Sequence, residues 1–370
     1  MVNKKNSDVV NTFLKIVQID SPTFHEEEMA KNVFNRLTAI GLKPRIDKEG
    51  NVLAFLKGDS NKETYLINAH LDTVQDPDGP VIKPSINKQD WIVSDGKTIL
   101  GADNKTAVAA ILETINRLVR EKNANHHPLE IVFTVSEESG NHGAHGLNYK
   151  QLKSKRGFCF DAGGRKFGDM IIASPFYNRF DIIFEGKSAH ASRPDLAINV
   201  LPVFSKAFLN IRLGRLSKNT TANIGIVSVG KNGGPVNTIP GEIIIGGEVR
   251  SMDEKELETV TLKIKKEFEK ESKKSKVKMK YLKTRENNGF KFDIKDQFIT
   301  NTLKQLSNLG IKEPELVKSW GCYEANIFAE HGIMMLNIAD GSLDNHAKTE
   351  RIKVTDLEKL GNLVYELIIN

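Results

Sequence analysis

The sequence predicts an α/β protein whose mainly parallel sheet is interrupted by a second, α+β domain. Apolar segments of strand length alternate with helical segments up to residue 161, as they do in parallel sheets covered by helices. From residue 177 the order becomes strand, helix, strand, strand, helix and strand, which is the ferredoxin-like βαββαβ plan. After this inserted segment, the alternation of strands and helices resumes. We therefore expect one domain from residues 1–175 and 288–370, and an inserted domain from residues 176–287.

The first domain shows the periodicities of both element types. Thr64–Ala69 and Leu129–Val135 are near-continuously apolar, which is typical of central strands covered on both faces. Gly41 marks the end of an amphipathic helix. The predicted helices lie at 7–19, 24–40, 106–118, 296–309 and 354–369, and the predicted strands at 43–47, 52–56, 64–69, 129–135, 157–160 and 334–338.

The inserted domain combines strands with one strongly charged helix. Its predicted strands lie at 177–186, 224–229, 242–249 and 277–282, and its helices at 196–213 and 253–274. The net charge of +6 concentrates between Lys263 and Lys283, where lysines alternate with glutamates, so we interpret this stretch as solvated helix surface. No row of aromatic residues forms a stacking platform beside it, and nucleic-acid binding is not expected.

Composition describes an ordinary globular protein of two domains, with 370 residues, 39% hydrophobic and 27% charged. The longest apolar runs have strand length, so no transmembrane helix is expected. Met1–Lys5 lead into a polar helical pattern without the apolar stretch of a secretory signal, which makes the cytoplasm the expected location. Cys159 and Cys322 form no CxxC pair, so neither a disulfide nor a thiolate metal site is expected, and Cys159 reads as a buried apolar residue.

Five separated segments end in side chains that bind transition metals. Four of them follow predicted strands or lie in loops at strand ends, where an α/β sheet places its reaction site. The candidate ligands are His70, Asp103, Glu138, Asp161 and His346. A lone His-x-Asp or Glu-Glu pair is more often a surface or cap feature, but the joint occurrence of all five favours a metal centre.

A shared carboxylate would divide these ligands between two ions. If Asp103 bridges, one ion takes Asp103, Glu138 and His346, and the other takes His70, Asp103 and Asp161. Each ion then has three protein ligands and an open position, as in catalytic zinc sites, and a hydroxide spanning the open positions would be the nucleophile.

Two further acidic residues have roles beside the ligands. Because adjacent residues point in different directions, Glu137 is not expected to coordinate in the same way as Glu138, and it is free to act as general base. Asp72 follows His70 by two residues and is placed to hold its other ring nitrogen. Among the remaining histidines, His126 and His127 precede a proline in a polar loop and are expected to be exposed to solvent.

The motifs resemble those of a known enzyme family. The strings are NAHLDTV, LGADNKTAVAAIL, TVSEESGNHGAHGL, FDAGG, EGKSAHAS, GGPVNTIP, EVRS and SLDNHAKTE. Together they resemble the dinuclear-zinc metallopeptidase family of carboxypeptidase G2-type enzymes, aminoacylases and peptidase T. The resemblance implies the zinc-exopeptidase fold with a ferredoxin-like lid. It also implies the same five ligands with Asp103 bridging, Glu137 as base, Asp72 as orienting acid, and a cis bond between Asp103 and Asn104.

The resemblance also assigns residues of the inserted domain. His190 resembles the histidine that stabilises the tetrahedral oxyanion, and Asn237 and Arg250 resemble lid residues that hold substrate, Arg250 by a bidentate grip on a carboxylate. We expect the insert to close over the metals, and its exposed edges suit a homodimer. The implied cofactors are two divalent ions, zinc first, with Co²⁺ or Mn²⁺ as alternatives.

Asp161 points toward the substrate class. Deacylase and carboxypeptidase relatives tend to have Glu at this position, whereas Asp resembles the peptidase T-like group, so we expect a tripeptide aminopeptidase acting on short peptides. Glu324 stands where relatives usually have Asp, and Thr106 where Gly is common, and both could reshape the pocket. Two alternatives stay open: an amidohydrolase of the same fold that removes an acyl group or a C-terminal amino acid, and a non-catalytic peptide-binding protein.

Overall fold

The computed structural model describes residues 7–122, 125–230 and 235–370, and these form two compact units. The first unit combines Met1–Ile172, Lys291–Ser319 and Tyr323–Asn370, and the second combines Ala173–Phe290 with Trp320–Cys322. Each main boundary lies three residues from the predicted one (172 against 175, and 290 against 287), and the short segment 320–322 was not predicted in the second unit. The expectation for Met1–Lys5 lies outside the described residues.

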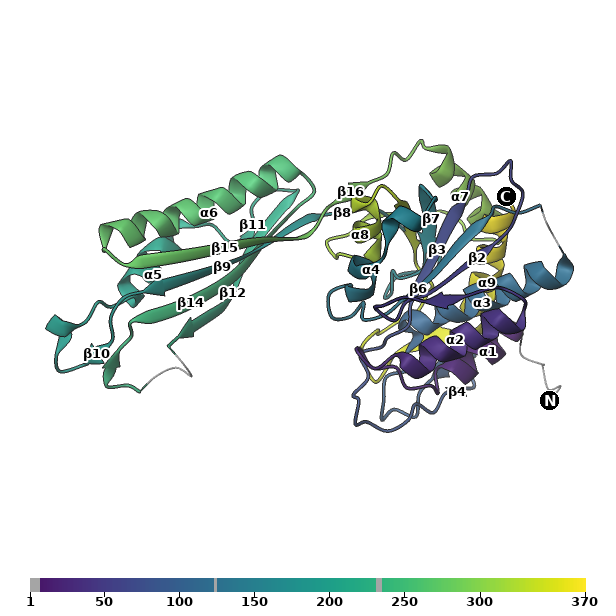
Figure 1. Ribbon diagram of the computed structural model, residues 1–370, viewed down its shortest axis with the longest axis horizontal. Helices are drawn as coiled ribbons and strands as arrows, with labels where there is room; N and C mark the ends of the chain where they lie inside the picture. The colour runs from purple at the N-terminus through teal and green to yellow at the C-terminus, as the bar shows by residue number, and fades with distance from the viewer. Residues whose placement is uncertain (1–6, 123–124, 231–234) are drawn as a thin grey trace. The chain divides into compact units, whose positions relative to one another are not determined.

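The first unit is built on a mainly parallel sheet, which confirms the predicted α/β class (Figure 1). Four neighbouring strands are parallel in the order β6-β3-β7-β18. Their bounds are Leu129–Thr134, Tyr65–His70, Arg156–Cys159 and Met334–Ile338. Antiparallel pairs flank this centre: β2 (Val52–Leu56) joins β6, with β1 (Arg45–Ile46) at the edge, and β8 (Met170–Ser174) joins β18. The sheet also includes β16 (Phe290–Lys291) and β17 (Leu316–Lys318).

Helices pack around this sheet largely where the sequence predicts them. They are α1 (Asp8–Ile16), α2 (Glu27–Ala39), α3 (Ala102–Glu121), α7 (Gln297–Asn308) and α9 (Val354–Ile369). Helices α1, α3 and α9 pack on one another. Two short helices, α4 (His142–Gly146) and α8 (Glu324–Glu330), also belong to this unit, and their one or two turns leave little periodicity from which to define their bounds in the sequence. A small sheet joins β19 (Arg351–Lys353), β5 (Trp91–Val93) and β4 (Ser85–Ile86).

One expectation about histidines is wrong. His126 and His127 are buried rather than exposed. The His127 ring stacks on Tyr65 with 3.9 Å between ring centroids, and its Nδ1 pairs with the carbonyl of Glu63 at 2.7 Å. Burial of Cys159 is confirmed. Among the described residues, no helix is long and apolar enough to cross a membrane.

The second unit has the predicted βαββαβ order (Figure 1). It runs β9 (Phe176–Glu185), α5 (Leu201–Asn210), β12 (Thr220–Val229), β14 (Glu242–Ser251), α6 (Glu254–Lys274) and β15 (Lys278–Asn287). The sheet order is β11-β12-β14-β9-β15, with β11 at Gly214–Arg215. Since β14 is antiparallel to both β9 and β12, it lies between two parallel strands, which defines the ferredoxin-like plan.

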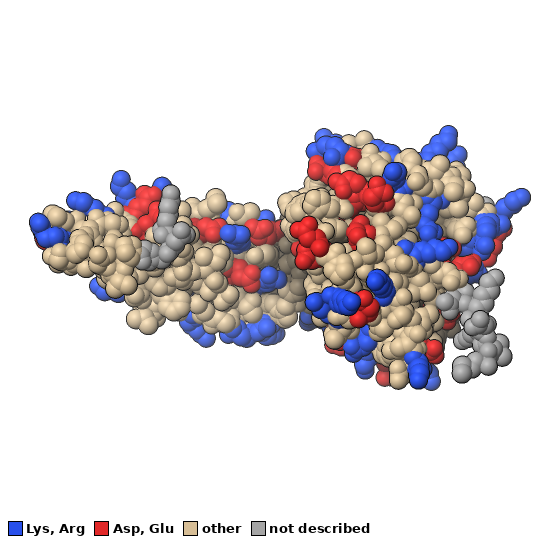
Figure 2. Space-filling model, turned by 90° about the horizontal axis from the view of Figure 1, so that it is seen from below, with Lys and Arg blue, Asp and Glu red and all other residues tan. Residues whose placement is uncertain are grey.

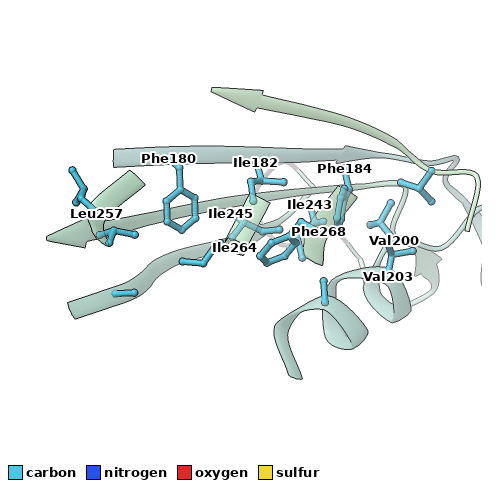
Figure 3. Close-up of a cluster of buried hydrophobic side chains, with 14 residues drawn as sticks. Phe180, Ile182, Phe184, Val200, Val203, Ile243, Ile245, Leu257, Ile264 and Phe268 are labelled. Carbon is cyan, nitrogen blue, oxygen red and sulfur yellow. The ribbon is translucent and has the colours of Figure 1, made fainter. Parts of the chain in front are cut away.

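Helix α6 contributes one apolar face to the hydrophobic core of the second unit. Leu257, Ile264 and Phe268 recur at helical spacing, are buried, and pack with Phe180 and Phe184 of β9 (Figure 3). The exposed side of the helix carries lysines paired with glutamates, such as Lys270 with Glu267. Figure 2 shows Lys and Arg side chains beside Asp and Glu on the visible face of this unit. The charged helix is therefore amphipathic, with one face in the core.

Candidate metal centre

The parallel strands deliver four of the five candidate ligands to one edge of the sheet. His70 is the last residue of β3, Glu138 follows the end of β6, Asp161 follows the end of β7, and His346 lies in the loop after β18. Because parallel strands end on the same side, their carboxyl ends bring these side chains together.

Asp103 reaches the same edge from the start of α3. Asp103 and Asn104 have non-helical dihedral angles, so the regular helix begins after them. The bond between them is cis, as the resemblance implies. The non-helical dihedral angles place Asp103 at the helix start, before the first regular turn.

The five ligand candidates form two groups that share Asp103. His70, Asp103 and Asp161 offer atoms within 4.8 Å of one another, and so do Asp103, Glu138 and His346. One Asp103 oxygen lies 3.0 Å from His70 Nε2, and the other lies 3.3 Å from His346 Nε2. Each carboxylate oxygen therefore faces one imidazole, which is the arrangement that a bridging ligand needs.

The charges in these groups fit cations. Burial raises the pKa of Asp161 well above its ordinary value, and the carboxylates of Asp103 and Glu137 add to the effect. Hydrogen bonds with Asp103 and Glu138 raise the pKa of His346 to about 10, because the two carboxylates favour positive charge beside them. Buried carboxylates at this density need such compensation. The oxygen and imidazole donors suit two divalent ions of the Zn²⁺, Co²⁺ or Mn²⁺ kind.

Glu137 lies at the same centre. Its carboxylate groups with His70 and Glu138 within 4.8 Å, so distance alone allows it to be a ligand as well as a base. Burial raises the pKa of Glu137 to about 8. A buried carboxyl whose pKa lies near neutrality has the property expected of a general base.

Asp72 connects two parts of the centre. Its carboxylate lies 3.3 Å from His70 Nδ1, in keeping with the orienting role that the sequence suggests. The same carboxylate accepts hydrogen bonds from the backbone N–H groups of Glu137 and Glu138, at 2.9 and 3.1 Å, and from the hydroxyl of Thr23. One buried side chain thus fixes the His70 ring and the Glu137–Glu138 backbone together.

Other positioning contacts were missed from the sequence. Asn345 donates to Asp103 at 2.9 Å, and a Cβ on Gly163 would overlap the Asn345 side chain, which explains a glycine in FDAGG. Asn337 of β18 binds both the N–H and the carbonyl of Asp161, at 2.8 and 2.9 Å. The glycine pair after Asp161 was the one signal available, because it marks close packing against another segment.

The two departures from the resemblance make contacts inside the first unit. Glu324 is buried at the start of α8 and accepts from the Thr134 hydroxyl at 2.7 Å, and burial raises its pKa to about 7. The Thr106 hydroxyl donates to Asp340 at 2.6 Å. Both side chains therefore make buried contacts within the first unit, and neither replaces a candidate ligand.

The three lid candidates lie in the second unit, at two separate places. His190 and Asn237 lie on paired backbone segments, with 3.4 Å between Asn237 Nδ2 and His190 Nε2. Arg250 pairs instead with Glu248, through Nε at 3.1 Å and Nη2 at 3.2 Å, and donates to the carbonyl of Trp320. The edge of the Arg250 guanidinium that could bind a substrate carboxylate is therefore already paired with the carboxylate of Glu248.

The sheet register separates these two places. Arg250 of β14 lies opposite Tyr177 at the start of β9, whereas Glu242 lies opposite Glu185 at the end of β9. His190 lies beyond that end, on β10 (Ala189–His190), as Figure 1 shows within this unit. The eight residue steps from Glu242 to Arg250 alone span about 26 Å, at about 3.3 Å per residue.

An α/β domain with two ligand groups that share one carboxylate defines a candidate dinuclear metallohydrolase. The sequence model of Peptidase family M20/M25/M40 matches residues 66–370, and the chain belongs to this family. It is a metallopeptidase of the hydrolase class, so the alternative of a non-catalytic peptide-binding protein is set aside.

Known proteins match the chain along its whole length. Aminopeptidase PepT from Bacillus cereus ATCC 10987 is 32% identical with a TM-score of 0.89, covering 98% of this chain and 97% of that one. A tripeptidase from Staphylococcus aureus subsp. aureus Mu50 is 28% identical, with the same TM-score and coverage. The uncharacterized protein YqjE from Bacillus subtilis (strain 168) is 32% identical over 100% of this chain and 99% of its own length.

Proposed function

We propose that this chain is a tripeptide aminopeptidase that uses two divalent metal ions, zinc in the first instance. The observation that carries the proposal is the placement of Asp103 between two groups of metal-ligating side chains, with Glu137 at the same centre. Similarity to a solved aminopeptidase and a solved tripeptidase over nearly the whole chain supports the substrate class.

The proposed ligand sets are His70, Asp103 and Asp161 for one ion, and Asp103, Glu138 and His346 for the other. When bound, the ions supply Lewis acidity that polarises the scissile carbonyl and acidifies water. The Glu137 carboxylate takes the proton from the attacking water and passes it to the leaving amine nitrogen. Asp72 keeps the His70 ring oriented and holds the Glu137 backbone in place during this transfer.

A substrate panel tests the proposal directly. Purified protein loaded with zinc is incubated with a tripeptide, its N-acetylated form, its C-terminal amide, and the matching dipeptide and pentapeptide. We expect release of the N-terminal residue from the free tripeptide, and loss of cleavage when the N-terminus is acetylated. Cleavage of the acetylated peptides alone, or release of the C-terminal residue, would instead establish the amidohydrolase alternative.

We also propose substrate roles for His190, Asn237 and Arg250, with His190 stabilising the oxyanion and Arg250 exchanging Glu248 for a substrate carboxylate. A tripeptide spans only about 10 Å, so one copy of the second unit cannot place both His190 and Arg250 against it. A homodimer in which His190 and Asn237 act on the other copy's substrate resolves this separation.

Mixing two inactive variants tests the homodimer. Glu137→Gln and His190→Ala are expected to be nearly inactive alone, and refolding them together is expected to restore about one quarter of wild-type activity, because half of the dimers are mixed and each mixed dimer has one intact site. Activity is measured after co-refolding, with each variant refolded alone as the control. No recovery, despite mixed dimers shown by differential tagging, would place His190 in its own chain's site.

A further inference from the structure

The buried carboxylate of Glu350 contacts the segment that presents Asp103. Its Oε2 accepts hydrogen bonds from the backbone N–H groups of Leu100 and Gly101, at 2.9 and 2.6 Å, and its Oε1 accepts from the N–H of Asp103 at 3.0 Å. The side chain is 1% exposed. These N–H groups precede the regular part of α3 and have no partner within the helix, so one carboxylate satisfies three of them.

Glu350 is itself held by the loop that carries His346. Leu343 and Arg351 bond to each other in both directions across the base of this loop, at 2.9 and 3.0 Å, so residues 344–350 form a closed loop. The N–H of Glu350 also donates to the carbonyl of Ala347. Asn345 of the same loop donates to the Asp103 carboxylate. This loop therefore holds Asp103 at both its backbone and its side chain.

We propose that Glu350 is a positioning residue that fixes the backbone of Asp103, so that each oxygen of that carboxylate meets one of the two ligand groups. The inference rests on the proposed function, because it takes Asp103 as the shared ligand. Because the Asp103 carboxylate would bind both ions, the direction of each of its two oxygens must be fixed. The loop that carries His346 fixes the backbone of Asp103 through Glu350. This contact links the position of Asp103 to that of His346.

The chain offers a matched control. Glu130 is also buried, and its carboxylate accepts from the N–H groups of Lys153 and Ser154 and from the Ser154 hydroxyl. It lies near the first residue of β6, whereas the candidate ligands lie at the carboxyl ends of the strands. Glu130→Gln therefore disturbs a similar clamp away from the centre.

The test compares Glu350→Gln, Glu350→Asp and Glu130→Gln with wild type. An amide oxygen at position 350 can still accept from Leu100 and Gly101, but its NH₂ group then faces the Asp103 N–H, donor against donor. Zinc affinity is measured by competition with a chelator, without peptide, and the free energy of unfolding of the metal-free proteins is measured in urea. We expect Glu350→Gln to weaken both zinc sites about tenfold or more, and Glu350→Asp to weaken them less. Glu130→Gln should lose stability but keep wild-type affinity within about twofold.

Three outcomes would overturn the proposal: unchanged zinc affinity in Glu350→Gln, an equal loss of affinity in Glu130→Gln, or, should Glu350→Gln fail to fold, unchanged affinity in Glu350→Asp. The measurement is independent of cleavage. A wild-type protein that binds two zinc ions but cleaves no tripeptide would refute the proposed substrate, while the comparison at Glu350 would still decide the positioning role.

Discussion

Replacing Glu137 with Gln is expected to lower kcat by about 10²- to 10⁴-fold, which is the usual contribution of general acid–base catalysis. The amide has nearly the shape of the carboxylate but cannot accept a proton from water. Bound metal should stay at two ions per chain, because the proposed ligand sets do not include this side chain. The measurement pairs steady-state kinetics on a free tripeptide with metal analysis of the same samples.

Loss of a bound ion from the Glu137→Gln variant is the outcome that would contradict a role as general base. Glu137 groups with His70 and Glu138 closely enough to bind an ion, so a variant that lost one ion together with its activity would reveal a ligand instead of a base. Glu138→Gln is the matched control, since it makes the same chemical change at the adjacent residue. It is expected to release the ion that it shares with His346.

Asp103→Asn is expected to weaken metal binding more than the replacement of a ligand that serves one ion, because this one substitution weakens both sites. Asp161→Asn and His346→Ala should each weaken one site. After dialysis against a chelator, we expect about one retained ion in each single-site variant and none in Asp103→Asn, whose affinity should fall by more than the 10- to 100-fold typical of groups that only support a ligand.

Metal analysis at a series of chelator concentrations distinguishes these cases. A tightly held ion in Asp103→Asn would show that the carboxylate serves one group alone, despite the 3.0 and 3.3 Å distances from its two oxygens to His70 and His346. Unfolding in urea of each metal-free variant provides the control for general damage. Asn has nearly the same shape as Asp, so this replacement leaves no unfilled space around position 103.

The strands and the candidate ligands could be predicted because their signals are local. A central strand such as β3 is apolar along its whole length, and the polar residue that ends it is visible in the same short stretch. The second unit was predictable for a similar reason, because Leu257, Ile264 and Phe268 recur at helical spacing in an otherwise charged segment.

The contacts that position the ligands could not be predicted, because their partners lie far apart in the sequence. Glu350 and Asp103 are separated by 247 residues, and Asn345 and Asp103 by 242. The burial of His127 could not be predicted for the same reason, since its stacking partner, Tyr65, lies far away in the sequence. Trp320–Cys322 joined the second unit through partners such as Arg250 and Ser174.

The order of the segments along the chain has a consequence for biosynthesis. His70 and Asp103 precede the inserted second unit in the sequence, whereas His346 and Glu350 follow it. A nascent chain therefore carries an incomplete set of candidate ligands until the segment after the second unit has been made. Pairings this distant also raise the contact order and slow folding. We therefore expect peptide-cleaving activity only in chains that extend beyond Glu350, after the segments of the first unit on either side of the insert have come together.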